Sequence, residues 1–135
     1  MGSIRTDEYR HVLEDVLSTT QAKIQDVLIV DSVNEWAKEH GQDERNRLSP
    51  RAARCFTLSD SGNWLIVLAA EITPRMPKSI RSGLQMRGFD ITPIIDDRAF
   101  LVHLFLHELA HTLHPVATED ECDEWAFGHL QKYVV

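Results

Sequence analysis

Five residues near the end of the sequence combine the side chains needed for metal-assisted hydrolysis. His107 and His111 are four positions apart, and Glu108 directly follows the first of them, in the run His-Glu-Leu-Ala-His. On a helix, residues four apart lie on one face, so the two imidazoles can occupy two corners of a tetrahedral zinc site. Glu108 then points towards the open corner, where it can act as general base for a metal-bound water. We therefore expect a metal site with hydrolytic chemistry at these residues.

The sequence around this motif is strongly apolar, which predicts a buried helix. The apolar positions are Phe100, Leu101, Leu104, Phe105, Leu106, Leu109, Ala110 and Leu113. The alternative interpretation is an ordinary core helix with histidines at its edge. A buried polar group without a partner costs about 1–3 kcal/mol, and a buried charge costs more. A bound metal removes this cost, so the apolar surroundings favour a metal site.

Local signals place the motif on one helix and an acidic segment on the next. One of the aspartates at 96–97 can cap the motif helix, and Pro115 ends it because proline cannot continue a helix. Thr118 and Glu121 form a capping box, which predicts a last helix over about 119–132. The two helices are joined by a short loop, so we expect an antiparallel hairpin.

A catalytic zinc site usually has three protein ligands, and the third must come from outside the motif. In the predicted hairpin, the first two turns of the last helix face His111. Glu119 and Asp123 are four apart on one face of that helix, so spacing alone leaves both as candidates. Favourable charge at a helix N-terminus explains the neighbouring Asp120 and Glu121, but it does not explain such a pair beside the motif.

The last helix also carries a family resemblance. Glu119 and Asp123, followed by Trp125-Ala126, resemble the E-x-x-x-D element of the gluzincins. The pattern is closest to the E-x-x-A-[ND]-x-F-A form of the ImmA/IrrE-like metallopeptidases. The resemblance covers roughly residues 98–130, with a weaker match in the preceding hairpin. It implies a small zincin-like domain.

The resemblance implies a role for each polar residue. In that family the two motif histidines and the downstream glutamate bind one zinc ion, which implies His107, His111 and Glu119 as ligands. It also implies Glu108 as general base and Asp123 as a carboxylate that orients a ligand histidine. Seven residues separate His111 from Glu119, a shorter connection than in many gluzincins, so Asp123 remains the alternative ligand.

The remaining sequence predicts an α+β fold. The expected elements are a helix capped by Thr6, a strand over Val27–Val30, a helix capped by Ser32 and ended by Gly41, and a hairpin of strands 54–58 and 64–70. Prolines and glycines predict that 72–95 is mostly loop, with one helical turn over 79–86. We expect a single domain over 1–135, with N-terminal helices and a short, mostly antiparallel sheet packed on the motif helix, followed by the C-terminal helix.

Composition narrows the classes of function. The chain has 135 residues and a net charge of −7, which does not favour binding to nucleic acid phosphates. It contains no apolar run of about 18 residues, so we expect no membrane span. No secretory signal is recognisable at the N-terminus, and the two cysteines are expected to be reduced. The expected location is the cytoplasm.

The expected function is that of a zinc-dependent peptidase, in which a metal-activated water hydrolyses a peptide bond with Glu108 as base. The strand over 64–70 is the candidate edge for an extended peptide. The expected partner is a protein or peptide substrate. By the family resemblance, the substrate class extends to a single regulatory protein, such as a repressor or antitoxin.

Two other functions fit the same residues. One is a non-catalytic metal-binding or protein-interaction module, whose structural site would need four protein ligands. His114 or Asp123 would then complete it. The other is a zinc hydrolase with a non-peptide substrate.

The sequence also suggests roles for several further residues. We expect His103 to be a hydrogen-bonded core histidine or an outer partner of the site, and His114 to cap the last carbonyls of its helix. Cys122 is expected to contribute packing. His129 and Tyr133 are candidates for stabilising an oxyanion.

Overall fold

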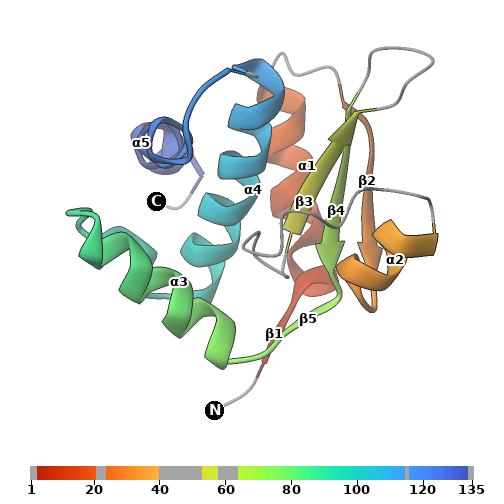
Figure 1. Ribbon diagram of the computed structural model, residues 1–135, viewed down its shortest axis with the longest axis horizontal. Helices are drawn as coiled ribbons and strands as arrows, with labels where there is room; N and C mark the ends of the chain where they lie inside the picture. The colour runs from red at the N-terminus through yellow and green to blue at the C-terminus, as the bar shows by residue number, and fades with distance from the viewer. Residues whose placement is uncertain (1–2, 21–23, 40–52, 58–63, 115, 134–135) are drawn as a thin grey trace.

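The computed structural model describes residues 3–20, 24–39, 53–57, 64–114 and 116–133. The fold is α+β and mostly helical (Figure 1). In chain order the elements are β1 (Ile4–Arg5), the 3₁₀ helix η1 (Thr6–Tyr9), α1 (Arg10–Thr19), β2 (Ile24–Val30), α2 (Val33–Glu39), β3 (Ala53–Thr57), β4 (Trp64–Ala69), β5 (Glu71–Ile72), α3 (Arg75–Met86), the 3₁₀ helix η2 (Thr92–Ile94), α4 (Asp97–Leu113) and α5 (Glu119–Leu130).

The main sheet has the strand order β2-β4-β3. β3 and β4 form the expected antiparallel hairpin, with Cys55 opposite Ile66, whereas β2 runs parallel to β4, with Val27 opposite Ile66. The expected mostly antiparallel sheet thus holds in part, because β3 pairs antiparallel with β4 but β2 pairs parallel with it. A second, two-stranded sheet joins β1 and β5 antiparallel.

β4 is the central strand, so the prediction that it offers a free edge to a substrate is wrong. Its residues 65–69 are all buried, as expected for a continuous apolar run covered on both faces. Both of its edges are occupied, by β2 and β3. In the described sheet, β3 has a neighbour on one side only, and it packs against α4.

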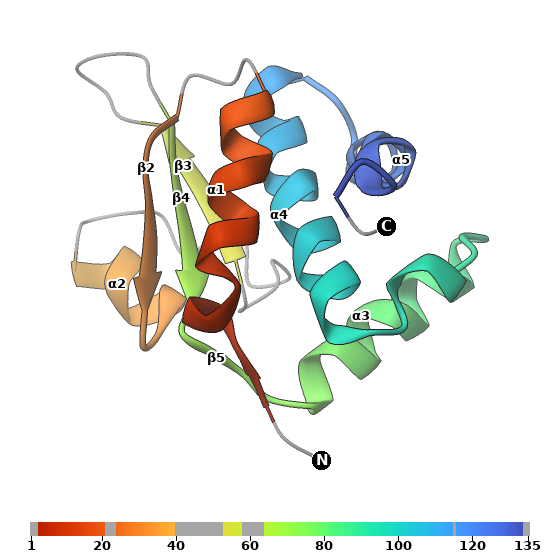
Figure 2. The ribbon, with the colours of Figure 1, turned by 180° about the vertical axis from the view of Figure 1, so that it is seen from behind.

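α4 lies at the centre of the molecule (Figures 1 and 2). It contacts α1 and the sheet on one side and α5 on the other. All residues from Ala99 to Ala110 are buried, as its apolar sequence predicts. Asp96 caps its start by accepting a hydrogen bond from the Ala99 amide at 2.8 Å, and the helix ends at Leu113.

α5 follows α4 after a short connection but crosses it, so the expected antiparallel hairpin is wrong (Figures 1 and 2). The predicted capping box of α5 is confirmed. The Thr118 hydroxyl accepts a hydrogen bond from the Glu121 amide at 3.1 Å, and the Thr118 amide donates to the Glu121 carboxylate at 3.0 Å. These bonds satisfy amides that have no partner within the helix. The start of α5 is therefore fixed locally.

The prediction of a mostly irregular segment before α4 is wrong, because α3 is a helix of 12 residues. Pro77 lies in its first turn, where the missing amide proton costs no helical hydrogen bond. Met76, Ile80 and Leu84 are four apart and pack on the core. Burial of this stripe outweighs the local signals from proline and glycine.

Two predicted helix starts have different outcomes. Thr6 does not cap a helix, because its buried hydroxyl donates to the Ala69 carbonyl and links η1 to the end of β4. Ser32 accepts a hydrogen bond from the Glu35 amide at 3.2 Å and begins α2 as predicted. The predicted end of that helix at Gly41 lies outside the described residues.

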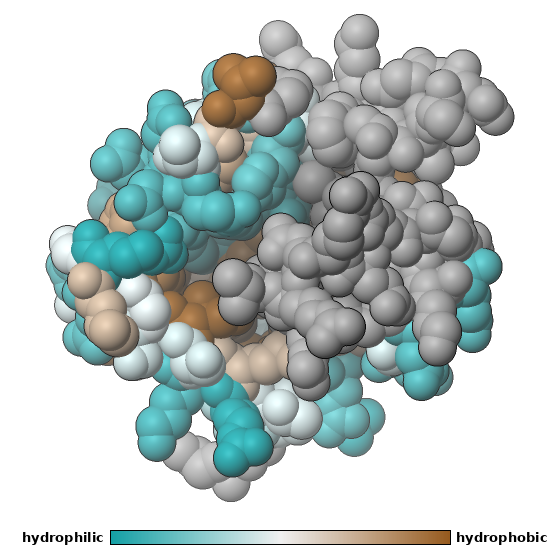
Figure 3. Space-filling model, viewed as in Figure 1, coloured by the Kyte–Doolittle hydropathy of each residue, from teal (hydrophilic) through white to brown (hydrophobic). Residues whose placement is uncertain are grey.

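The surface of the molecule is consistent with the burial of its apolar residues. In the space-filling view of Figure 3, the described surface is largely hydrophilic, and hydrophobic residues show at the upper edge and in a hollow towards the middle of the face. None of the helices in the described ranges combines the length and apolarity needed to cross a membrane.

The capping box predicts a measurable loss of stability. Thr118→Ala removes the side-chain acceptor and should lower the free energy of unfolding by about 1 kcal/mol, whereas Thr118→Ser should retain most of it. Urea denaturation with a metal chelator present isolates this effect from metal binding. Equal stability of the alanine variant and the unchanged chain would contradict the proposed cap.

Candidate metal centre

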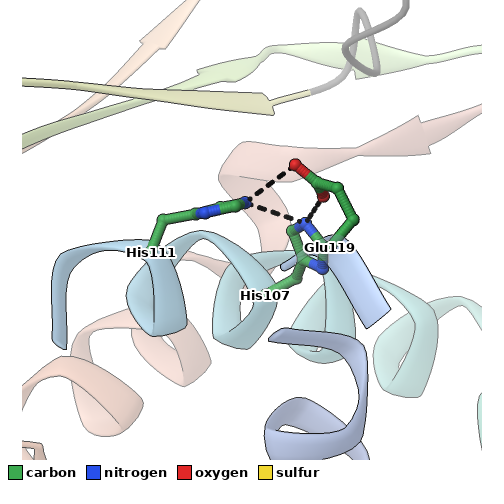
Figure 4. A group of neighbouring side chains, drawn as sticks. All are labelled: His107, His111 and Glu119. Carbon is green, nitrogen blue, oxygen red and sulfur yellow. Dashed lines mark hydrogen bonds and ion pairs between the residues drawn. The ribbon is translucent and has the colours of Figure 1, made fainter. Parts of the chain in front are cut away.

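Three side chains from α4 and α5 bring their donor atoms together (Figure 4). His107 Nε2 lies 2.7 Å from Glu119 Oε2 and 3.2 Å from His111 Nε2. His111 Nε2 lies 3.3 Å from Glu119 Oε1. The spacing of the motif places both imidazoles on one face of α4, and the short connection brings the first residue of α5 over them.

The geometry of this group fits a divalent metal. A tetrahedral zinc ion with bonds of about 2.0–2.1 Å holds its ligand atoms about 3.3 Å apart. The 3.2 Å between the two imidazole nitrogens matches that separation, and the two Glu119 oxygens lie 2.7 Å from His107 and 3.3 Å from His111. Two imidazole nitrogens and a carboxylate also form the donor set of several catalytic zinc sites. The described residues form one such group of metal-compatible side chains, and it consists of these three.

The centre lies at the boundary between core and solvent. The side chain of His107 is 10 % exposed and that of His111 is 23 % exposed, whereas the Glu119 side chain is 63 % exposed. Solvent therefore reaches the group from the side of α5.

Asp123 contacts the opposite nitrogen of His107 rather than the donor group. Its Oδ1 accepts hydrogen bonds from His107 Nδ1 at 2.8 Å and from His103 Nε2 at 3.2 Å. Its Oδ2 accepts from Arg87 Nη2 at 2.9 Å. A proton held on Nδ1 leaves the Nε2 lone pair of His107 directed at the centre. The structure thus places the two candidate acids in different positions, Glu119 at the donor nitrogens and Asp123 behind them.

His103 is a hydrogen-bonded core histidine, one of the two roles expected for it. Burial lowers its pKa despite the nearby Asp123 carboxylate, so the ring is neutral and donates through Nε2. Its Nδ1 is buried without a hydrogen-bond partner in the part of the chain that the structure describes. The ring packs on Phe127 of α5, with centroids 4.3 Å apart.

Cys122 contacts the second ligand histidine, which adds a role to the expected packing. Its sulfur lies 3.6 Å from His111 Nδ1. Burial, with nearby acidic side chains, raises the pKa of the Cys122 thiol to about 12, so the thiol stays protonated. Positions 119, 122 and 123 share one face of α5. One face of this helix therefore supplies a donor atom and an outer partner for each histidine.

Glu108 is also close to both histidines. The residue is 5 % exposed, and its negative charge raises the pKa of His107 and of His111. It follows His107 directly on α4, so it belongs to the same turn of the helix. A carboxylate at this place can exchange a proton with a group bound at the centre.

The charges of the centre favour one bound cation. Burial lowers the pKa of His107, but hydrogen bonds to Asp123 and Glu119 outweigh it and raise the pKa to about 10. Hydrogen bonds to His107 and His111 lower the pKa of Glu119. Burial raises the pKa of Asp123, but its histidine partners outweigh this effect and lower it. A proton on His107 or a metal ion can supply the missing positive charge.

The other expected helpers are engaged elsewhere. The Tyr133 hydroxyl is hydrogen-bonded to Thr19, and His129 Nδ1 donates to the Trp125 carbonyl at 2.8 Å. His114 is the exposed residue that ends α4, and it is not a member of the donor group. None of these contacts involves the centre.

Sequence reasoning missed the contribution of Arg87. This residue ends α3, in a segment expected to be mostly loop, and it reaches α5 from 36 positions earlier in the chain. Its only local signal is a positive charge. To identify Arg87 from the sequence, one would have to know that residues 75–86 form a helix and that the end of this helix reaches α5.

Comparison of the chain with protein-family models, with curated proteins and with solved structures finds no match. The functional argument therefore depends on the residues of this centre and their geometry.

The two acids should differ in their effect on metal affinity. Glu119→Ala removes a donor atom and should weaken zinc binding by more than about 100-fold, whereas Asp123→Ala removes an outer hydrogen bond and should weaken it about 10–100-fold. Competition with a chromophoric chelator measures both, with the exposed Glu124→Ala as control. A larger loss in the Asp123 variant would make Asp123 the ligand.

The raised pKa of His107 predicts how the metal-free protein responds to alkali. An unfolded histidine has a pKa of about 6.5, and the folded value is about 10. Protonation of His107 therefore stabilises the fold fully below pH 6.5, and this contribution is lost as the pH rises through about 10. Urea denaturation with a chelator at pH 6, 8 and 10 gives the free energy of unfolding. This free energy should fall less steeply with rising pH for His107→Gln than for the unchanged chain. The exposed His11→Gln is the control, and equal slopes for the two histidine variants would contradict the assignment.

Proposed function

We propose that this chain is a zinc-dependent peptidase with a zincin-like fold, of the gluzincin type and closest to the ImmA/IrrE-like metallopeptidases. One observation carries the proposal: the donor atoms of His107, His111 and Glu119 converge while Glu108 is buried beside both histidines. This combination supplies metal ligands and a base at one place.

The proposal favours a catalytic site over a structural one. Structural zinc sites are closed by four protein ligands, whereas catalytic sites have three and an open position. The donor group in the described residues has three members and reaches solvent through Glu119.

The roles of the chain's own residues follow from their positions. When bound, zinc would lower the pKa of a coordinated water to about 7 and polarise the substrate carbonyl. The Glu108 carboxylate accepts the proton of the attacking water and delivers it to the leaving amine nitrogen. Asp123 keeps the proton of His107 on Nδ1, so that Nε2 remains available as a donor.

The proposed substrate is a peptide segment of a protein, and a single regulatory protein belongs to this class. Support comes from β3, which packs against α4 and has β4 as its one neighbour in the described sheet. The close-up in Figure 4 draws this strand above His111 and Glu119. An extended peptide can pair with a free strand edge. We also propose a cytoplasmic location, which suits the free thiol of the buried Cys122.

The base assignment predicts a selective loss of activity. Glu108→Gln keeps the size of the side chain but removes its capacity to accept a proton, so hydrolysis should fall by about 100-fold or more. Zinc content and unfolding temperature should stay unchanged. The assay compares cleavage of a peptide library by the zinc-loaded chain, by the variant and by the exposed Glu124→Gln control, with a chelator arm.

The same assay separates the alternative functions. Undiminished cleavage by Glu108→Gln would contradict the mechanism. Zinc binding without cleavage of any peptide, protein or small ester would favour a metal-binding or interaction module. Cleavage confined to non-peptide compounds would favour the other hydrolase class.

A further inference from the structure

Arg87 bridges α3 to the metal-binding face of α5. One guanidinium nitrogen, Nη2, donates to Asp123 Oδ2 at 2.9 Å, and the other, Nη1, donates to Asp120. The Asp123 side chain is 6 % exposed, whereas the Asp120 side chain is 59 % exposed. Exposed ion pairs contribute little because water and salt screen them. The buried arm to Asp123 is therefore the one with energetic consequence.

The surrounding residues hold the guanidinium in place. Gly88 follows Arg87 with φ +91°, a backbone conformation that strongly favours glycine, and turns the chain back. Phe89 then lies below the Arg87 guanidinium, 5.5 Å from ring centroid to carbon, and stacks on Phe127 of α5 at 5.6 Å. The arginine is therefore placed by a turn and an aromatic pair rather than by its charges alone.

Arg87 donates the hydrogen bond to the second carboxylate oxygen of Asp123. Oδ1 receives both histidines, His107 and His103, and Oδ2 receives Arg87. Without the guanidinium, the carboxylate would be free to rotate away from His107 Nδ1, and a buried oxygen would lose its partner. The orientation of the ligand histidine thus depends on Arg87, the C-cap residue of α3, which contributes no donor atom.

We propose that Arg87, the C-cap residue of α3, is a positioning residue of the metal centre, which acts through Asp123 on His107. The inference rests on the proposed zinc site. On this proposal the end of α3 influences the metal affinity, although no residue of α3 belongs to the donor group.

Arg81, which lies within α3, offers a matched control for Arg87. Arg81 also uses its guanidinium for structure, donating through Nε to the Ile94 carbonyl at 2.7 Å and through Nη2 to the Ile95 carbonyl at 2.8 Å. It also lies over the Phe100 ring, 5.0 Å from the centroid. Loss of Arg81 should therefore lower stability without changing the metal centre.

The experiment measures zinc affinity by chelator competition and the absorption spectrum of the cobalt-substituted protein. Arg87→Met should weaken zinc binding about 10–100-fold and alter the cobalt spectrum, as expected for loss of an outer-shell contact. Arg87→Lys should retain part of the affinity. Asp120→Asn should stay within about threefold of the unchanged chain, because this arm is exposed. Arg81→Met should keep full affinity although its unfolding temperature falls.

A double variant tests the route through Asp123. In the Asp123→Ala background, Arg87→Met should cause little further loss of zinc affinity, because both act on the same contact. Additive losses would overturn this route. Equal affinity of Arg87→Met and Arg81→Met would overturn the proposal, and so would a loss in Asp120→Asn as large as that in Arg87→Met. If Arg87→Met does not fold, Arg87→Lys decides: unchanged affinity and an unchanged cobalt spectrum would overturn the proposal.

Failure of this inference is distinguishable from failure of the proposed function. An unchanged chain that binds no zinc would overturn the zinc site itself. If the unchanged chain binds zinc and Arg87→Met binds it with the same affinity, only the role of Arg87 is overturned.

Discussion

The buried carboxylate of Asp123 is the contact on which the arrangement of three helices depends. A charge that is 4 % exposed would be strongly unfavourable without partners. Asp123 on α5 has three, two histidines from α4 and Arg87 from α3. Their hydrogen bonds offset its desolvation only while all three helices keep their places. The same contact therefore fixes the packing and orients a donor nitrogen.

Polar groups inside this core are concentrated on one face of α4 rather than scattered. The helix is buried from Ala99 to Ala110, yet it carries His103, His107 and Glu108 among apolar side chains. The sheet and α1 cover the opposite side with apolar residues. The buried charged and imidazole side chains of the described residues thus gather where α4 meets α5, whereas the buried Thr6 hydroxyl has its own partner in the Ala69 carbonyl.

Local sequence signals were sufficient for the elements that carry the centre. The cap at Asp96, the capping box at Thr118 and the apolar run of α4 each depend on residues within a few positions of one another. The spacing of the motif fixed which side chains share a face, because helix geometry is independent of the rest of the chain. The choice between Glu119 and Asp123 needed the packing of two helices, which spacing alone did not determine.

The wrong predictions share a physical cause, because they concern structure decided at long range. α3 forms despite its internal proline and glycine because tertiary burial outweighs local propensity. The residues of β2 that pair with β4 lie 39 or 40 positions earlier in the chain, and the central place of β4 cannot be derived from an apolar run. Arg87 reaches its acids only once the end of α3 meets α5.

The crowding of functional positions on one face of α5 has a consequence for how this chain can vary. Glu119, Cys122 and Asp123 share one helical phase, which the capping box sets at the first residue of the helix. Residues added to the preceding loop change the path to the helix but leave that phase intact. One residue added within the first turn would rotate all later positions by about 100° and separate the donor from both outer partners. Variation in length is thus tolerable before Thr118 and damaging just after it.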